Sequence, residues 1–557
     1  MDRRVVIAVL LVLVSAWAAI LLVGLKRDLP SPEADEPYFV LPAVEMAAHG
    51  DANPHWFGHP ASTVISPLAI VYRMRETVFH GGPVFGASPG VADRFQDDAD
   101  SFYILGRLWV VLLTLATVPV LFLVGRRLLG SGGALLATGC WMLVPIVVQY
   151  GRIVRSDSAG TLFGLLALLA CLRALDKPTA ARFMVGGAAI GVAISSRYFM
   201  VALIPVLMTV WWLARRRDRS MSIRSLALGL GASVAAFVAT TPYFLFDWRH
   251  AELSLRAETV GTIGNQHFGL MENLKYYLGT ALPHVLSWPV LVLAGLGVAI
   301  ALARRDAKQL LLIGYVTLFL GGISLSHLHW ERWTIPILPV LALFAVSAVL
   351  EGVREVSRRV RLQKRRLVFA GAMALGLAAL VIQPAVGLTR EEQRSLDVTT
   401  RQLMRSWVMR HLPVGTKIGG EVKAPELASA GYKVWDTYDL PTSGTVADYV
   451  AHGYRYFIVN AYISVAYRAR YLNYHRHSAF YLFLRRHSEL LADFAPHGSV
   501  TGPQLKLYRV DPASLLEHHG LSDRSTTVRS ANGGLRHEPK LYPVGAWLLR
   551  DDDDVGR

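Results

Sequence analysis

Long uncharged apolar runs recur along most of the chain and are separated by short, charge-rich stretches. The first run, residues 5–25, carries no charge over about twenty positions, enough helix to cross a hydrocarbon core about 30 Å thick. Apolar length and charged flanks together predict about eleven spanning helices. We place them at residues 5–25, 103–125, 133–150, 158–175, 183–196, 198–214, 223–241, 284–303, 309–326, 334–350 and 367–383.

The first run has a second interpretation, a cleaved signal peptide. Ala16-Trp17-Ala18 offers the small-x-small pattern of a cleavage site. The apolar run nevertheless continues to Leu25, beyond what the apolar core of a signal peptide needs. We therefore expect a retained first span.

Basic residues gather at the ends of the apolar runs, which explains the formal net charge of +16 without a nucleic-acid partner. Lys and Arg concentrate in the cytoplasmic loops of membrane proteins, so these clusters predict a cytoplasmic N-terminus and an odd number of spans. The loops 26–102, 151–157, 242–283 and 327–333 then lie outside, as does everything after about residue 384. The clusters are Arg3–Arg4, Arg126–Arg127, Arg215–Arg217, Arg304–Arg305 and the seven basic residues between 354 and 366.

Two of the outer regions are large. The first loop contains amphipathic stretches at 38–49 and 67–79, which suit helices lying in the membrane interface. After the last span, alternating helical and strand-like patterns predict a small α/β domain, with a helix at 396–411, strands at 456–459 and 505–508, and a helix at 479–491. We divide the chain into a transmembrane domain (1–388, including the outer loop 26–102), an extracytoplasmic α/β domain (389–511) and a polar tail (512–557) predicted to be disordered.

Candidate chemistry collects at the outer ends of the spans. Asp35 and Glu36 follow the first span, and a carboxylate there suits a general base. The loop 151–157 and the loop 327–333 bring arginines and histidines to the same membrane face, where they suit an anionic leaving group. The residues alone leave plain solvated loops and headgroup anchors as the simpler alternatives. The two cysteines, Cys140 and Cys171, lie inside apolar runs and predict packing.

The order of these motifs resembles the GT-C glycosyltransferases, specifically the branch with the protein O-mannosyltransferases and the lipid A aminoarabinose transferase. The resemblance covers nearly the whole chain. It rests on Asp35-Glu36, His59-Pro60, Arg155-Ser156-Asp157, Ser196-Arg197-Tyr198, Thr241-Pro242-Tyr243-Phe244, the stretch from His329 to Arg332 followed by Pro336 and Pro339, and Gly502-Pro503-Gln504 near the end. His59-Pro60-Ala61 lacks a second proline, and no β-trefoil insertion is visible, so a protein acceptor is in doubt.

The resemblance implies an enzyme of the plasma (inner) membrane that transfers a sugar, with inversion, from a polyprenyl-phosphate donor to an extracytoplasmic acceptor. Asp35 would act as the base, Glu36 would position the acceptor or support Asp35, and Asp157 matches the family's second-loop carboxylate. The donor phosphate would meet a set of basic side chains: His59, Arg155, Arg197, His329 and Arg332. The acceptor, whether cell-wall glycan, lipid or protein, stays open, and three carboxylates would also suit a divalent cation with unknown ligands.

Two other functions compete with a transferase. A transporter or flippase of lipid-linked sugars would be expected to carry charges deep within spans and an internal repeat, and the sequence shows neither. A non-catalytic assembly partner would keep the fold without the activity. The presence of Asp35, Glu36 and Asp157 together argues against that alternative.

Overall fold

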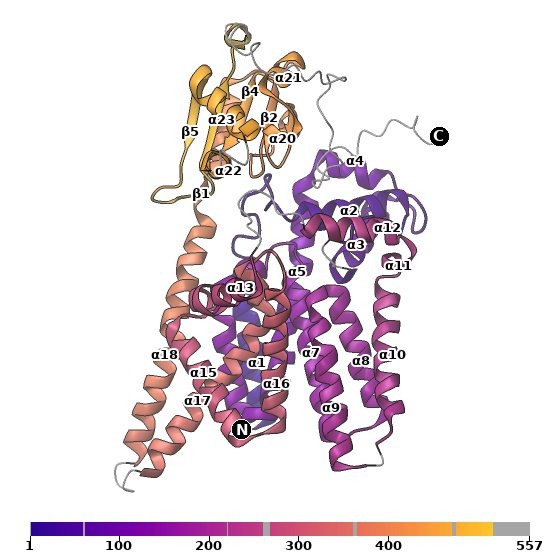
Figure 1. Ribbon diagram of the computed structural model, residues 1–557, viewed down its shortest axis with the longest axis vertical. Coiled ribbons are helices and arrows are strands. Elements are labelled where there is room, and N and C mark those ends of the chain that lie inside the picture. Colours follow the sequence, from indigo (N-terminus) through magenta and orange to yellow (C-terminus); the bar gives the residue numbers. More distant parts are fainter. Residues whose placement is uncertain are drawn as a thin grey trace.

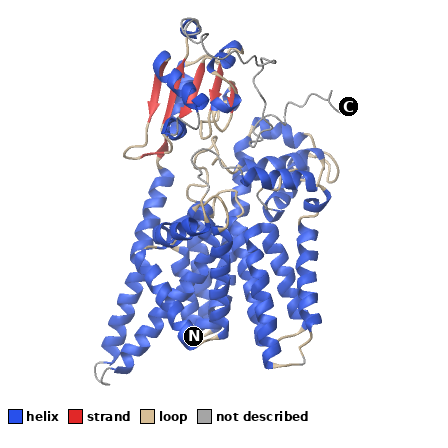
Figure 2. Ribbon diagram, in the orientation of Figure 1, coloured by secondary structure: helices blue, strands red, loops and turns tan. Residues whose placement is uncertain are grey.

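The computed structural model describes residues 2–58, 62–219, 221–259, 268–359, 365–469 and 475–515. It consists of a bundle of long helices with a smaller α/β domain at one end (Figure 1 and Figure 2). The amino terminus lies at the opposite end of the bundle from this domain (Figure 1). The fold is therefore a polytopic helical membrane protein with a C-terminal α/β domain, as the apolar pattern predicts.

The bundle contains helices long and apolar enough to cross a membrane. Within the described residues eight meet this condition singly, and a ninth does so as a pair of helices bent by 117°. The pair joins the segment Leu270–Leu286 to α15 at Ser287, whose φ is 72°. The bundle helices are α1 (Arg3–Leu22), α5 (Ala99–Met142), α6 (Pro145–Tyr150), α7 (Asp157–Asp176), α8 (Ala180–Ser196), α9 (Leu203–Arg217), α10 (Ile223–Thr240), α15 (Trp288–Arg304), α16 (Ala307–Ser324), α17 (Leu338–Arg359) and α18 (Arg365–Leu396).

Helix α5 is two antiparallel arms rather than one rod. Its 44 residues would measure about 66 Å as a continuous helix, more than twice a hydrocarbon core. Gly130 leaves the helical conformation (φ 73°, ψ 179°), and Gly125 packs directly against Ala134 across the turn. The Thr114 hydroxyl donates to the Gly151 carbonyl at 3.2 Å, so the second arm, continued by α6, returns alongside the first arm.

The two arms of α5 account for separate apolar runs in the sequence, at 103–125 and 133–150. The short apolar helix α8 accounts for another. With the nine segments above, they give eleven candidate crossing segments in the described part of the chain, which agrees with the number that the sequence predicts.

The loop 26–102 folds into three helices at the bundle end that carries the α/β domain (Figure 1), α2 (Pro37–His49), α3 (Ser62–His80) and α4 (Gly90–Asp97). The predicted helical stretches at 38–49 and 67–79 are thus confirmed. Phe39, Leu68 and Tyr72 are buried in a hydrophobic cluster that these helices share with the start of α5. Gly50 ends α2 with φ 73°, and a side chain there would meet the backbone of Gly86 at 2.5 Å. The loop is therefore a packed layer, and it holds in place the acidic segment with Asp35 and Glu36 that precedes α2.

The α/β domain is built on a five-stranded sheet in the order β3-β2-β4-β7-β5. β2, β3 and β4 are parallel, while β7 runs antiparallel to both β4 and β5. A two-stranded pair, β1 with β6, lies at the junction with α18. The strands are β1 (Val398–Thr399), β2 (Lys417–Gly420), β3 (Lys433–Asp436), β4 (Tyr456–Asn460), β5 (Glu489–Phe494), β6 (Val500–Thr501) and β7 (Leu505–Arg509).

Helices cover both faces of this sheet. Along β4, Phe457 and Val459 face one hydrophobic cluster and Ile458 faces the other, as strand alternation requires. α19 (Thr400–His411) packs on the Ile458 side, and α23 (His475–His487) packs on the Phe457 side. The predicted helix 479–491 is wrong at its end, because the helix stops at His487 and the residues from Glu489 form the edge strand β5 against β7.

Candidate functional site

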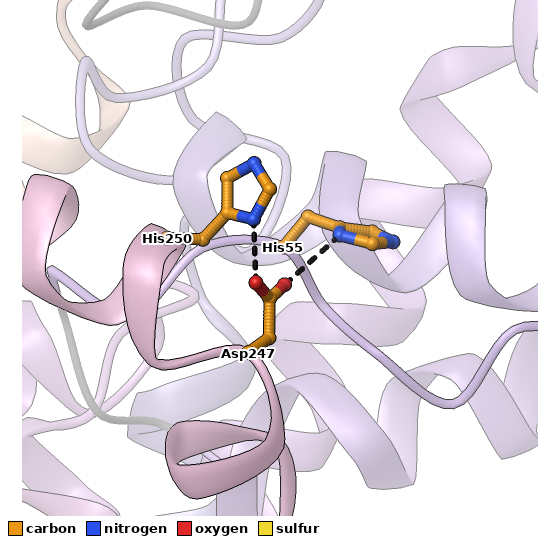
Figure 3. Close-up of side chains that lie close together, drawn as sticks. All are labelled: His55, Asp247 and His250. Carbon is orange, nitrogen blue, oxygen red and sulfur yellow. Dashed lines mark hydrogen bonds and ion pairs between the residues drawn. The ribbon is translucent and has the colours of Figure 1, made fainter. Parts of the chain in front are cut away.

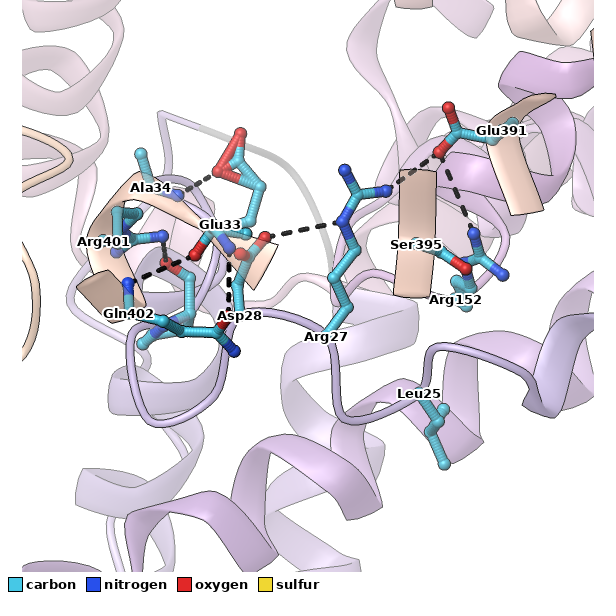
Figure 4. Close-up of polar contacts among 12 residues, drawn as sticks. Leu25, Arg27, Asp28, Glu33, Ala34, Arg152, Glu391, Ser395, Arg401 and Gln402 are labelled. Atoms are coloured by element: carbon cyan, nitrogen blue, oxygen red, sulfur yellow. Dashed lines mark hydrogen bonds and ion pairs between the residues drawn. The ribbon is translucent and has the colours of Figure 1, made fainter. Parts of the chain in front are cut away.

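The α/β domain is fastened to the chain segment that leads from α1 to Asp35. Arg27 pairs with Glu391 at 3.0 Å, and Arg401 donates to the Pro32 carbonyl at 2.9 Å. The backbone N–H of Glu426 donates to the Ser31 hydroxyl at 2.8 Å. Figure 4 shows Arg27 beside Glu391 of α18, and Arg401 of the α/β domain near Asp28 and Glu33. The segment from α1 to Asp35 is thus held between the helical bundle and the α/β domain.

Glu36 is the innermost acid of this segment and is not exposed at all. Its carboxylate accepts hydrogen bonds from Arg107 Nε (2.8 Å) and Nη2 (2.6 Å), and from the backbone N–H groups of Val154 (3.0 Å) and Glu33 (2.9 Å). Arg107 is itself only 3% exposed and also donates to the Leu25 carbonyl at 2.7 Å. Every oxygen of Glu36 is thereby occupied, which makes this residue a support of the segment.

Asp35, next to Glu36, faces a different environment. Its side chain is 23% exposed and forms ion pairs with Arg155 and, at 3.3 Å, with Arg332. The two arginines come from different loops, one after α6 and one at the start of the short helix Glu331–Ile337. Asp35 is therefore a carboxylate that water and substrate can reach, held by two guanidinium groups.

Asp157 lies deeper, at the first residue of α7, and is 1% exposed. It pairs with Arg197, which follows α8, and with Arg155 Nε at 3.2 Å. Arg155 thus bridges Asp157 and Asp35. In this position Asp157 orients two arginines toward the outer surface and has little area left for contact with a substrate.

The charged side chains around Asp35 and Asp157, which we call the Asp35 centre, carry more positive than negative charge. Three guanidinium groups, from Arg155, Arg197 and Arg332, meet the carboxylates of Asp35 and Asp157. Burial, together with the neighbouring Arg332 guanidinium, lowers the pKa of Arg155 to about 9. Among the described residues, buried Arg332 Nε has no hydrogen-bond partner. An anion placed beside Arg332 would satisfy this donor and reduce the repulsion between the arginines.

Glu33 extends the same charge pattern toward the α/β domain. Burial alone would raise its pKa, but the positive charges of Lys423, Arg155 and Arg401 lower it. Lys423 and Arg401 belong to the α/β domain, so that domain contributes to the field around the acidic segment. This contribution could not be predicted from sequence patterns, because about 370 positions separate Arg401 from Pro32.

Of the two predicted histidines, His329 has different surroundings from the arginines. His329 Nδ1 lies 2.7 Å from Asn273 Oδ1, and the ring stacks on Tyr276 with centroids 3.7 Å apart. Burial lowers the pKa of His329, which favours its neutral form. Its side chain therefore contacts α13 (Leu270–Tyr276) and Phe268 just before that helix, and its role toward a phosphate stays a prediction. His59 lies outside the described residues.

Arg107 is the residue of the centre that the sequence analysis missed. It lies inside the apolar run 103–125, and a charged side chain within a span is itself a signal of function or pairing. Each of the three predicted carboxylates, Asp35, Glu36 and Asp157, is engaged by arginine. In the described part, the cluster of histidine and carboxylate side chains close enough together to share a metal ion lies elsewhere, at His55, Asp247 and His250.

Comparisons with known proteins agree with this architecture. Residues 103–246, which contain Arg107, Arg155, Asp157 and Arg197, match the family model described as dolichyl-phosphate-mannose-protein mannosyltransferase. The chain is similar to ArnT from Cupriavidus metallidurans in the apo state, with 15% identity, a TM-score of 0.52, and coverage of 90% of this chain and 98% of that one. No curated protein matches the sequence.

Two further solved structures show a weaker likeness. ArnT from Cupriavidus metallidurans bound to undecaprenyl phosphate gives 15% identity and a TM-score of 0.49, covering 90% of this chain and 98% of that one. The oligosaccharyltransferase AglB from Archaeoglobus fulgidus, in complex with an inhibitory peptide and a dolichol-phosphate, gives 11% identity and a TM-score of 0.47, covering 91% and 74%. The resemblance to the GT-C branch of protein O-mannosyltransferases and ArnT is confirmed by the family match and by the fold shared with apo ArnT.

Proposed function

We propose that this protein is a membrane glycosyltransferase that moves one sugar from a polyprenyl-phosphate donor to an acceptor outside the cytoplasm. The observation that carries the proposal is the position of Asp35. It is a partly exposed carboxylate at the outer end of the bundle, flanked by Arg155 and Arg332. A base for an acceptor hydroxyl and cations for a leaving phosphate are the two requirements of this transfer.

The reaction follows from this arrangement. The acceptor oxygen attacks the sugar's anomeric carbon, Asp35 takes the hydroxyl proton, and the bond from that carbon to the phosphate oxygen breaks. The polyprenyl phosphate leaves with the electron pair and is stabilised by Arg332 and Arg155. Attack from the face opposite the leaving group inverts the configuration at the anomeric carbon.

The two salt bridges of Asp35 have a role in these reaction steps. Without donor, the Asp35 carboxylate partly compensates the charges of Arg155 and Arg332. An arriving phosphate competes for the same N–H donors, which frees lone pairs on Asp35 for the acceptor hydroxyl. Binding of the donor thereby prepares the base. Arg197 and Asp157 hold Arg155 from behind and set its direction.

The proposal includes an orientation in the plasma membrane. Basic residues at the ends of the helices, such as Arg215–Arg217 of α9 and Arg304 of α15, belong to the bundle end that carries the amino terminus (Figure 1). Because such clusters favour the cytoplasmic side, Asp35 and the α/β domain face outward. There they meet a lipid-linked donor and an extracytoplasmic acceptor, which is a glycan, a lipid or a protein.

A donor panel tests the proposal directly. Purified protein in nanodiscs is incubated with polyprenyl phosphates that carry different sugars, together with envelope extract as the source of acceptor. Mass spectrometry should show release of free polyprenyl phosphate from at least one donor. Movement of an intact donor across a vesicle bilayer, with no cleavage of any donor, would instead identify a transporter and refute the transferase.

A further inference from the structure

A compact group of metal-binding side chains lies on the outer surface, formed by two separate segments. His55 comes from the loop after α2, while Asp247 and His250 lie between α11 (Tyr243–Phe246) and the first turn of α12 (Trp248–Thr259). One ligand atom from each of the three residues lies within 4.8 Å of the others. Figure 3 shows Asp247 between the two imidazoles, with one oxygen directed at each ring.

The distances approach those of a coordinated ion. His55 Nδ1 lies 3.3 Å from Asp247 Oδ2, and His250 Nδ1 lies 2.6 Å from Asp247 Oδ1. Ligand atoms around a tetrahedral zinc ion are separated by about 3.3 Å. A contraction of at most about 1.5 Å between the two imidazole nitrogens, both on exposed side chains, would complete that geometry.

His55 is oriented as a metal-binding histidine is. Its Nε2 lies 2.8 Å from Asp51 Oδ2, so this nitrogen carries the proton and the lone pair of Nδ1 accepts from Asn53 Nδ2 at 3.1 Å, beside Asp247. A carboxylate behind an imidazole fixes the tautomer and raises the basicity of the ligand in known sites. The backbone of His55 adopts φ 50°, which only a minority of non-glycine residues do. The ring direction is therefore set by the local chain.

Asn53 shows that acceptor atoms converge at this point. Its Nδ2 donates to Asp247 Oδ2 at 2.7 Å and lies 3.1 Å from His55 Nδ1. It thus contacts the same two lone-pair positions that a cation would occupy.

We propose that His55, Asp247 and His250 bind a zinc-class divalent cation with water as the fourth ligand. Two imidazoles and a carboxylate suit zinc and its transition-metal neighbours, whereas magnesium and calcium prefer oxygen ligands. The ion links two segments that already touch, since the Phe57 N–H donates to the Ser254 hydroxyl at 3.2 Å. The site joins the first outer loop to the outer segment after α10, and it is separate in its residues from the Asp35 centre.

Zinc titration of tag-free, chelator-stripped protein against a fluorescent indicator tests the site. We expect one tight equivalent in the native protein and at least a tenfold loss of affinity in the His55→Ala/His250→Ala variant. The control is His49→Ala, which removes another exposed histidine that pairs with a carboxylate, Glu45. This control should bind zinc as the native protein does. Zinc should raise the melting temperature of native protein and control, and leave the double variant unchanged.

A second variant guards against a folding defect in the first. Asp51→Asn keeps all three ligands and removes only the orienting carboxylate, so zinc affinity should fall about tenfold to a hundredfold. Equal zinc binding by the native protein and both variants would overturn the proposal, as would an equal loss in His49→Ala. No outcome depends on transfer activity, so the metal site and the proposed function fail independently.

Discussion

Replacing Glu36 by Gln separates structural support from catalysis at the paired acids. The substitution keeps size and shape but removes the charge that compensates Arg107, whose side chain is 3% exposed. Breaking a buried ion pair by removing one partner costs about 3–5 kcal/mol. Each Glu36 oxygen accepts two hydrogen bonds, so the amide NH2 group that replaces one oxygen turns two of the four bonds into contacts between donors.

The expected result is a large loss of stability together with a loss of transfer. Because Glu36 holds the segment that carries Asp35, the base should lose its position, so kcat should fall more than donor affinity. The measurements are the melting temperature in nanodiscs and the steady-state transfer rate. Glu45→Gln is the matched control, since it removes a half-exposed carboxylate of α2 that pairs with His49.

A double variant tests the cause. Adding Arg107→Met to Glu36→Gln removes the uncompensated charge and should recover part of the lost stability, although the bonds from Arg107 to the Leu25 and Arg27 carbonyls are also lost. Unchanged stability in Glu36→Gln would refute the support role. Full stability with complete loss of transfer would assign Glu36 to catalysis.

Three further changes have defined outcomes. Arg332→Gln should weaken binding of polyprenyl phosphate about tenfold to a hundredfold, because a charge-assisted hydrogen bond contributes about 1.5–3 kcal/mol. The control Arg256→Gln, which changes an exposed arginine, should bind polyprenyl phosphate as the native protein does. Equal affinities of Arg332→Gln and the native protein would contradict the phosphate role. Arg152→Met, which removes the bond to Glu392 at 2.9 Å, should make α18 more open to proteolysis with donor affinity unchanged; an unaltered digestion pattern would contradict this. Burial raises the pKa of Glu421 to about 8, so the α/β domain should lose stability, by a few kcal/mol, as pH rises from about 4.5 to 8, and Glu421→Gln should flatten that slope in thermal melts. An identical slope in both proteins would contradict it.

The bundle follows from the sequence because each span is determined by local apolar length. The α5 hairpin was also predictable, because Arg126 and Arg127 separate two apolar runs. Strand β5 was not visible, because residues 489–491 also suit a helix and only pairing with β7 makes them a strand. Edge pairing is a tertiary effect that periodicity does not contain.

The side chains of the centre were predictable by membrane face but not by partner. Charge and topology placed Asp35, Arg155 and Arg332 at one end of the bundle, and the structure brings them together. Charge and topology did not indicate that Glu36 pairs with Arg107, because the packing of α2 against α5 determines which of several arginines Glu36 contacts. The contact between His55 and Asp247 was equally hidden, since it joins distant segments of the chain.

Transfer by Asp35→Asn is the most direct test of the proposed base. A general base contributes about a hundredfold to ten-thousandfold in rate, so transfer should fall by that amount. Affinity for polyprenyl phosphate should hold or increase, because a negative charge beside Arg155 and Arg332 is lost. Asp93→Asn, an exposed carboxylate on α4, should transfer normally. Native-like transfer by Asp35→Asn would contradict the account.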